Sequence, residues 1–202
     1  FVDGGNDRVG IGLVPNAMLE VGGEIRISDP SADSHVYLRG ASGQKAKVTL
    51  NEFGVRSWEI GAGTKASGVF TIDNNGTEVL RIDGNNAMTK PLQPAFQARP
   101  TSQQSNLPIN ANTTIIFGTE IFDQNGDFAS NTFTAPVTGK YQLSVSLYVL
   151  NADIDVNYFS SILETSNRAY SNVITTESYD ADLSYTSITQ SALVDMDAND
   201  TA

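Results

Sequence analysis

Residues 133–149 read Phe-Thr-Ala-Pro-Val-Thr-Gly-Lys-Tyr-Gln-Leu-Ser-Val-Ser-Leu-Tyr-Val, a turn that leads directly into a long alternating segment. From Tyr141 to Val149 every odd position is apolar, and the first three even positions are polar. This period of two is that of a β-strand with one buried face. Pro136 and Gly139 mark the turn before the strand.

The rest of the chain has the same texture. Short β-branched and aromatic runs alternate with Gly, Asn, Asp, Ser and Thr, and helical periodicity is nearly absent. Pairs in which Asn or Asp precedes Gly indicate tight reversals; they begin at Asp3, Asn75, Asp83 and Asn125. The sequence therefore predicts an all-β protein. The predicted strands are 18–21, 24–28, 36–39, 46–50, 57–61, 68–73, 78–83, 95–98, 113–117, 128–134, 140–150, 156–164, 168–177 and 183–194.

A domain boundary is predicted near residue 92. Pro91 and Pro94 each restrict the preceding residue, and neither can donate a hydrogen bond to a sheet. The predicted strands of residues 1–91 are short, Gly-rich and weakly hydrophobic, whereas those of residues 92–202 are longer and more aromatic. Because the first part would bury little as a monomer, it would struggle to offset the backbone entropy of folding. We expect it to intertwine with identical chains.

Composition bounds the function. The chain has no cysteine, which removes disulfides, thiol catalysis and zinc–thiolate sites. A net charge of -11 with only 12 Lys and Arg argues against nucleic-acid binding, and an anionic membrane surface would repel the chain. No apolar run approaches the roughly 18 residues of a membrane helix, so no membrane insertion is expected. The chain opens at Phe1 rather than at Met, which is typical of a mature product or a fragment.

No catalytic site is expected. His35 is the only histidine, so a Ser-His-Asp triad would have to include it. Its neighbours Asp33 and Ser34 are explained more simply as part of a turn over residues 29–34. Glycosidase chemistry needs two facing carboxylates, and nothing distinguishes one pair among 23 acidic residues.

Calcium is the one cofactor that the sequence leaves open. Asp180 and Asp182, and also Asp195 and Asp197, place carboxylates at alternate positions in predicted loops, and oxygen ligands are those that calcium prefers. None of these segments has the full pattern of an EF-hand loop. Solvated turns are therefore the favoured interpretation, and calcium is the alternative.

Several aromatic residues of the second part could form a carbohydrate-binding or receptor-binding face. In an alternating strand, however, aromatic side chains more often pack in a core or between subunits, so packing is the favoured interpretation. The residues concerned are Tyr158, Phe159, Tyr170, Tyr179 and Tyr185.

Residues 8–23 read Arg-Val-Gly-Ile-Gly-Leu-Val-Pro-Asn-Ala-Met-Leu-Glu-Val-Gly-Gly. This segment resembles a module of bacteriophage tail-fibre and tailspike shafts, in which Val-Gly-Ile-Gly is followed by a proline and then by Leu-x-Val-x-Gly. Trp58-Glu-Ile-Gly61 and Phe70-Thr-Ile72 follow in the order that shafts of this family have. The resemblance implies an elongated, intertwined trimeric β shaft through residue 91.

The second part resembles the jelly-roll superfamily of tumour necrosis factor and the globular head of the first complement component. The most specific motif is the Phe-x-Ala-Pro-x-x-Gly-x-Tyr of residues 133–141, and in the family a Gly-Asp pair precedes the last strand, where this chain has Asn199 before Asp200. The signature residues to which the resemblance assigns structural roles are Phe96, Phe133, Pro136, Gly139, Tyr141 and Asp200.

The family continues with one or two closing strands beyond the position of Ala202. We therefore expect an incomplete jelly-roll head over residues 92–202, with an unpaired strand edge.

These resemblances imply a homotrimeric, non-enzymatic structural protein of a phage virion that attaches to a host-surface receptor or glycan and contacts other virion proteins. Its expected location is the virion or another extracellular setting. The alternatives are a secreted or surface bacterial adhesin or matrix protein and, less favoured, a depolymerase of surface polysaccharide. A fold does not name the ligand, so the receptor and the host stay open.

Overall fold

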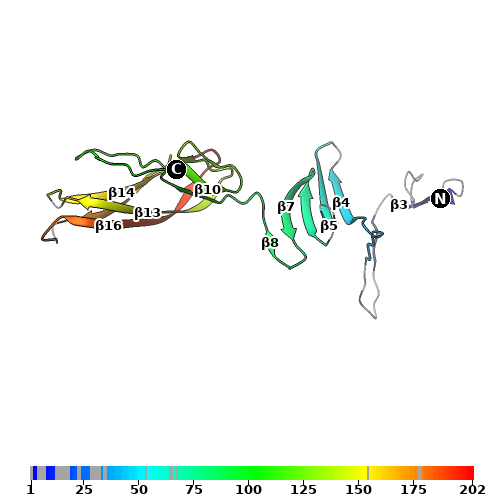
Figure 1. Ribbon diagram of the computed structural model, residues 1–202. Helices are drawn as coiled ribbons and strands as arrows, with labels where there is room; N and C mark the ends of the chain where they lie inside the picture. The colour runs from blue at the N-terminus through cyan, green and yellow to red at the C-terminus, as the bar shows by residue number, and fades with distance from the viewer. Residues whose placement is uncertain are drawn as a thin grey trace. The chain divides into compact units, whose positions relative to one another are not determined.

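The computed structural model describes residues 2–3, 8–11, 19–21, 24–27, 33, 36–52, 54–63, 66, 68–153, 155–176 and 179–202. These residues form β-strands and no helix, which confirms the all-β prediction (Figure 1). The chain divides into two compact units. The first unit comprises residues 1–77 and 82–87, and the second comprises residues 78–81 and 88–202.

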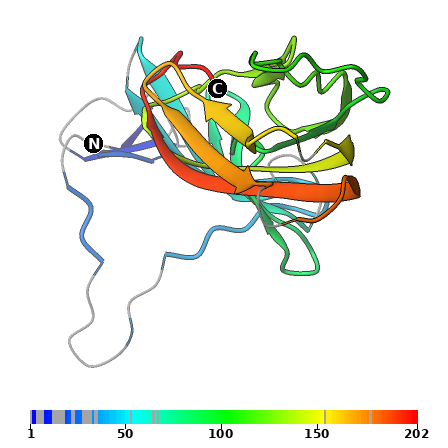
Figure 2. The ribbon, with the colours of Figure 1, turned by 90° about the vertical axis from the view of Figure 1, so that its left-hand side faces the viewer.

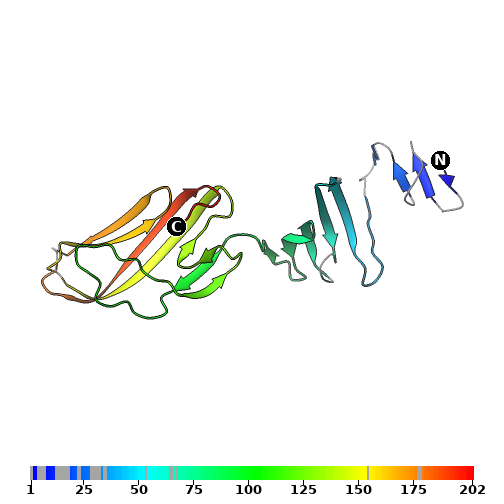
Figure 3. The ribbon, with the colours of Figure 1, turned by 90° about the horizontal axis from the view of Figure 1, so that it is seen from above.

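Two sheets precede residue 90. The first contains β1 (Val2–Asp3), β2 (Arg8–Ile11) and β3 (Leu19–Val21), in which β2 and β3 run parallel. The second has five strands in chain order: β4 (Ala46–Glu52), β5 (Arg56–Ala62), β6 (Phe70–Asn74), β7 (Thr77–Ile82) and β8 (Met88–Thr89) (Figure 3).

The turn between β6 and β7 is the one that the sequence indicates most directly. Asn75 and Gly76 have φ values of 46° and 82°, as a two-residue hairpin turn of type I′ requires. The Asn75 side chain also accepts a hydrogen bond from the backbone N–H of Ser57 in β5, at 2.8 Å. The reversal predicted at Asn75 is therefore present, and its side chain ties β5 to the hairpin.

Two predicted strands are wrong. Glu24–Ile27 and Val36–Arg39 lie within the predictions 24–28 and 36–39, but they form no strand and all their side chains are exposed. Their apolar residues alternate as in a strand. A strand also needs a neighbouring chain to complete its hydrogen bonds, and neither segment pairs with any part of the chain that the structure describes.

The first unit has a very small interior. Among its described residues only Val69, Thr71 and Asp73 are buried, and the Thr71 hydroxyl donates to the Asp73 carboxylate at 2.8 Å. Six of the seven residues of β4 are exposed, although strands alternate their side chains between two faces. Both faces of this strand are therefore largely open to solvent.

The second unit is β-sandwich-like and built from antiparallel strand pairs. The pairs β13–β16 and β14–β15 form its two layers (Figure 2). The strand pairs are β9 (Phe96–Arg99) with β10 (Thr119–Asp123), β11 (Phe128–Ala129) with β12 (Thr132–Phe133), β13 (Gly139–Ala152) with β16 (Leu183–Met196), and β14 (Tyr158–Glu164) with β15 (Ala169–Thr175).

The apolar and polar alternation from Tyr141 to Val149 determines which face of β13 points inward. Leu143 is buried, its odd-numbered neighbours are half-buried, and Gln142 and Ser144 are exposed. The register places Leu143 opposite Ala192 and Leu147 opposite Ile188 of β16. The apolar positions of both strands therefore share the inward face.

The second unit corrects two further predictions. The single strand predicted over 128–134 is two strands, β11 and β12, because Ser130 and Asn131 have φ values of 51° and 66° and form a turn between them. The segment 113–117 is not a strand. Its main chain is held by the side-chain amides of Gln104 and Asn131 rather than by a neighbouring strand.

Candidate binding surfaces

The signature aromatic residues meet in one cluster at the core of the second unit. The rings of Phe96 and Phe128 stack with centroids 4.6 Å apart, and the ring of Phe133 stacks on that of Phe96 at 5.3 Å. Tyr141 meets Phe133 edge to face, also at 5.3 Å. Aromatic pairs in these geometries stabilise beyond the area that they bury. Three of the six signature residues therefore lie together and have a structural role.

The two ends of the signature also pair with each other. Phe133 and Ala202 exchange both backbone hydrogen bonds at 2.9 Å, and Ala135 donates its backbone N–H to the carbonyl of Asp200 at 2.8 Å. Asn199 donates its N–H to the carbonyl of Ala135, also at 2.8 Å. The segment that precedes β13 thus pairs with the last residues of the chain.

Asp200 organises this pairing through its side chain. Its carboxylate accepts the backbone N–H of Asp197 and the side-chain amide of Asn167, both at 2.8 Å. The hydrogen bond from the Asp197 backbone, followed by one from the Ser166 side chain, holds the pKa of Asp200 below its usual value of 3.8. The folded protein therefore favours the ionised form of the Asp200 carboxylate.

The turn before β13 is fixed by a tyrosine rather than by its glycine. The Tyr141 hydroxyl donates to the carbonyl of Val137 at 2.5 Å. Gly139 lies in β13, and an added Cβ would meet only the Tyr141 ring at an ordinary contact distance of 3.7 Å. Pro136 is exposed. Neither a steric conflict nor a positive φ explains the glycine of the motif.

The outward face of the β13–β16 pair carries two exposed aromatic rings. Tyr148 and Tyr185 are 66% and 67% exposed, and their ring centroids lie 6.0 Å apart with the planes tilted by 31°. Leu150, beside them on β13, is also exposed. A large apolar surface that a folded chain leaves in solvent is a frequent sign of a contact site.

Next to the two tyrosines the same face is a row of hydroxyl and amide groups. Gln142 donates its side-chain amide to the Ser191 hydroxyl at 2.7 Å, and Ser144 and Ser191 share a hydrogen bond of the same length. Ser146 and Thr189 form the next pair across the strands, at 3.3 Å. This part of the face is uncharged and presents polar groups in fixed positions.

Some of the aromatic residues that the sequence singled out pack in the core of the second unit, and others are exposed, as a binding face or a contact between subunits requires. Tyr170 is half-buried against the core cluster and Phe159 is half-buried, which agrees with packing. Tyr158, Tyr179 and Tyr185 are exposed on the single chain. Tyr148 is not among the aromatic residues that the sequence singled out. Strand periodicity could have identified it, because Tyr148 occupies an even, outward position of β13.

The candidate calcium ligands do not gather. Asp195 forms an ion pair with Arg168 at 2.8 Å, and Asp197 accepts a hydrogen bond from Thr138 at 3.3 Å. Asp180 and Asp182 are exposed. Within the described part of the chain, no three acidic or histidine side chains are placed to hold one metal ion.

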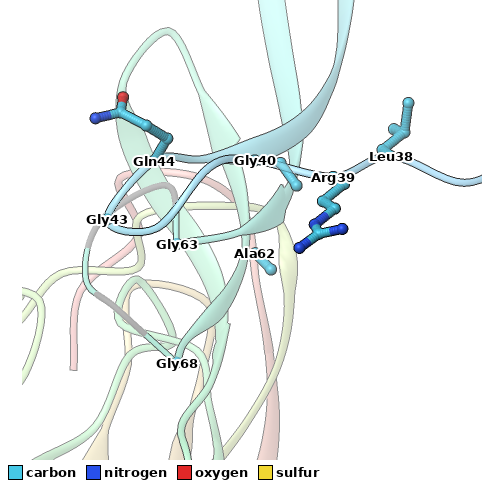
Figure 4. A pocket seen from close by; sticks show the side chains of 9 residues that line it. Leu38, Arg39, Gly40, Gly43, Gln44, Ala62, Gly63 and Gly68 are labelled. Carbon is cyan, nitrogen blue, oxygen red and sulfur yellow. The ribbon is translucent and has the colours of Figure 1, made fainter.

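Two further features could contribute to a binding or catalytic site: a cavity in the first unit and the histidine His35. The cavity, of about 300 Å³, lies in the first unit beside the start of β4 (Figure 4). Its lining is rich in glycine, and Arg39 is its only charged lining residue among those described. His35 lies outside the described residues.

No helix of the described chain is long and apolar enough to cross a membrane. Comparison with known proteins adds no relative: no family model, no curated protein and no solved structure matches this chain.

Proposed function

We propose that this protein is a non-enzymatic, homotrimeric fibre protein of a phage virion that binds the host surface through its second unit. The observation that carries the proposal is that both units leave large apolar side chains exposed on the single chain. Association with identical chains would cover them. The resemblance to shaft and head families indicates three chains.

The first unit supports association most directly. Val48 and Leu50 on β4 are exposed, as are Ile25, Val36 and Tyr37 in the segments before it. With three buried residues in its described part, this unit removes little apolar area from water. Burial of about 25 cal/mol for each Å² of apolar surface is the main favourable contribution to folding, so the missing contribution has to come from other chains.

The second unit supports a binding role. Its aromatic core makes it a stable scaffold, and its exposed Tyr148 and Tyr185 suit an interface rather than a monomer surface. In a trimer, three heads on one axis would convert weak single contacts with a receptor or glycan into firm attachment. The attachment would then rest on avidity instead of one deep pocket.

The first experiment is mass measurement by light scattering at low protein concentration, with and without a calcium chelator. A trimer gives three times the 21.6 kDa of one chain in both samples. A mass that falls with the chelator would assign calcium a role in assembly. A stable monomer of 21.6 kDa would contradict the trimer and the avidity mechanism.

The second experiment tests attachment. Labelled protein is incubated with host bacteria and compared with a Tyr148→Ser, Tyr185→Ser double variant and with a matched Tyr158→Ser variant on β14. We expect the double variant to lose trimer or cell binding, whereas Tyr158→Ser retains both. Binding to cells of the producing bacterium instead would favour the adhesin alternative. Release of reducing sugar from host capsule would contradict the non-enzymatic assignment.

A further inference from the structure

The strands β4, β5 and β6 of the first unit have two faces of opposite character. Residues directly opposite each other in neighbouring strands lie on the same face of a sheet. Three rows across these strands form one face, which we call the apolar face because Asn74 is its single polar residue and none of its residues is charged. The rows are Val48, Ile60 and Ile72; Leu50, Trp58 and Asn74; and Ala46, Ala62 and Phe70.

The other face of the same strands is polar and carries charges of both signs. Lys47 and Glu59 form an ion pair on it, and Asp73 lies in the row of Glu59. The two buried residues of these three strands, Thr71 and Asp73, both belong to this polar face. A sheet ordinarily buries its hydrophobic face, so the first unit shows the reverse arrangement.

The apolar face is open on the single chain. Val48, Leu50 and Phe70 are 43%, 56% and 39% exposed, and none of the nine residues in the three rows is buried. A missing strand does not explain this exposure, because β5 pairs with β4 on one side and with β6 on the other. What the apolar face lacks is a second layer packed against it.

The exposed area indicates that further copies of the chain supply this layer. The single chain exposes 14529 Å², whereas two separate compact units of half its mass expose about 11,000 Å² together. The surplus of about 3,400 Å² lies within the roughly 2,000–5,000 Å² that an obligate interface buries. Each chain of a trimer contributes half of two interfaces, so its share equals the area of one.

Charge indicates which face the copies share. Because each chain has a net charge of -11, identical chains repel one another and associate most favourably through surfaces without acidic residues. The apolar face meets this condition, whereas the polar face carries Glu59 and Asp73.

We propose that three copies of the chain associate in the first unit through the apolar face of β4, β5 and β6. The rows of each copy pack against those of the other two, so that Val48, Leu50 and Trp58 leave solvent together. The polar face, with its ion pair between Lys47 and Glu59, stays outside. This interface rests on the proposed function, since it requires the homotrimer, and it adds the surface through which the first unit assembles.

The only tryptophan of the chain, Trp58, lies on the apolar face and reports on the interface directly. Its fluorescence and the quenching of this fluorescence by acrylamide are measured on the 202-residue chain over a range of protein concentrations, while light scattering follows the mass. As the mass rises to that of a trimer, we expect the emission to shift to shorter wavelength and the quenching constant to fall several-fold.

Two variants on β4 identify the face. Val48 and Thr49 are exposed neighbours that point to opposite faces, and replacement of either by lysine adds one positive charge to the chain. Val48→Lys brings three unpaired ammonium groups into the interface, so the concentration at which half of the chains assemble should rise by on the order of tenfold or more. Thr49→Lys should leave the mass and the quenching as they are in the unchanged protein.

The outcomes separate the interface from the trimer itself. A trimer in which acrylamide quenches Trp58 as strongly as in dilute monomer would overturn the interface, as would a trimer that Val48→Lys leaves intact or that Thr49→Lys dissociates; the homotrimer would stand in each case. A chain that stays monomeric at every concentration would overturn both. The quenching measurement needs no variant, so it decides the question even if Val48→Lys does not fold.

Discussion

At the scale of single residues, the carboxylate of Asp200 links the last turn of the chain to the loop between β14 and β15. Its hydrogen bonds, from the backbone of Asp197 and the side chains of Ser166 and Asn167, favour the charged form. A group whose folded pKa lies below the unfolded value stabilises the fold above the unfolded pKa, and this stabilisation is lost as the pH falls through the folded pKa.

We therefore expect Asp200→Asn to lower the melting temperature by a few degrees at neutral pH, measured by circular dichroism. The difference from the unchanged protein should shrink well below pH 3.8, where both Asp200 and its replacement are neutral. The matched control is Asp197→Asn, whose carboxylate accepts only a weak hydrogen bond from Thr138, at 3.3 Å. A difference that stays constant with pH would contradict this account.

At the scale of elements, the segment 114–117 lies extended without belonging to a sheet. Gln104 donates to the carbonyl of Thr114 and accepts from the N–H of Ile116, at 3.1 and 2.6 Å. Asn131 accepts from the N–H of Phe117 and donates to the carbonyl of Ile115, at 2.6 and 3.1 Å. Two amides therefore substitute for two neighbouring strands.

Replacement of Asn131 by glycine should lower the free energy of unfolding by about 1–3 kcal/mol, because it leaves two main-chain groups without their partner. Glycine keeps the positive φ of 66° at this position, so the loss reports the amide and not the backbone. Asn110→Gly, at an exposed residue with φ of 60°, is the control and should change stability little. Urea unfolding measures both, and equal effects would contradict the role of the amide.

At the scale of the whole molecule, the net charge of -11 opposes the association that the exposed apolar residues favour. Salt at about 0.15 M screens charges beyond roughly 8 Å, so repulsion between chains weakens as the ionic strength rises. We expect the melting temperature, measured by scanning calorimetry, to rise from about 0.01 M to about 0.15 M salt. It should also rise with protein concentration, as it does for an oligomer. Independence of concentration would contradict association.

The second unit was the more predictable of the two. The alternation over β13 follows from a local pattern that packing reinforces, whereas structural roles for Phe96, Phe133 and Tyr141 were expected only from the resemblance. Asn199 likewise has a φ of 74°, a conformation that Gly adopts freely and Asn tolerates, which explains the residue type at that place in the motif. Local pattern and tertiary environment agree at these positions.

Local sequence thus suffices for the all-β class, the long strand β13 with its inward face, and the hairpin at Asn75, because periodicity and turn chemistry act within a few residues. The tertiary structure alone decided that Val36–Arg39 is not a strand, that amides replace strands beside Thr114–Phe117, and that side-chain amides link β15 to β16. The physical reason is that a main-chain hydrogen bond needs a partner, and that partner lies far away in the sequence.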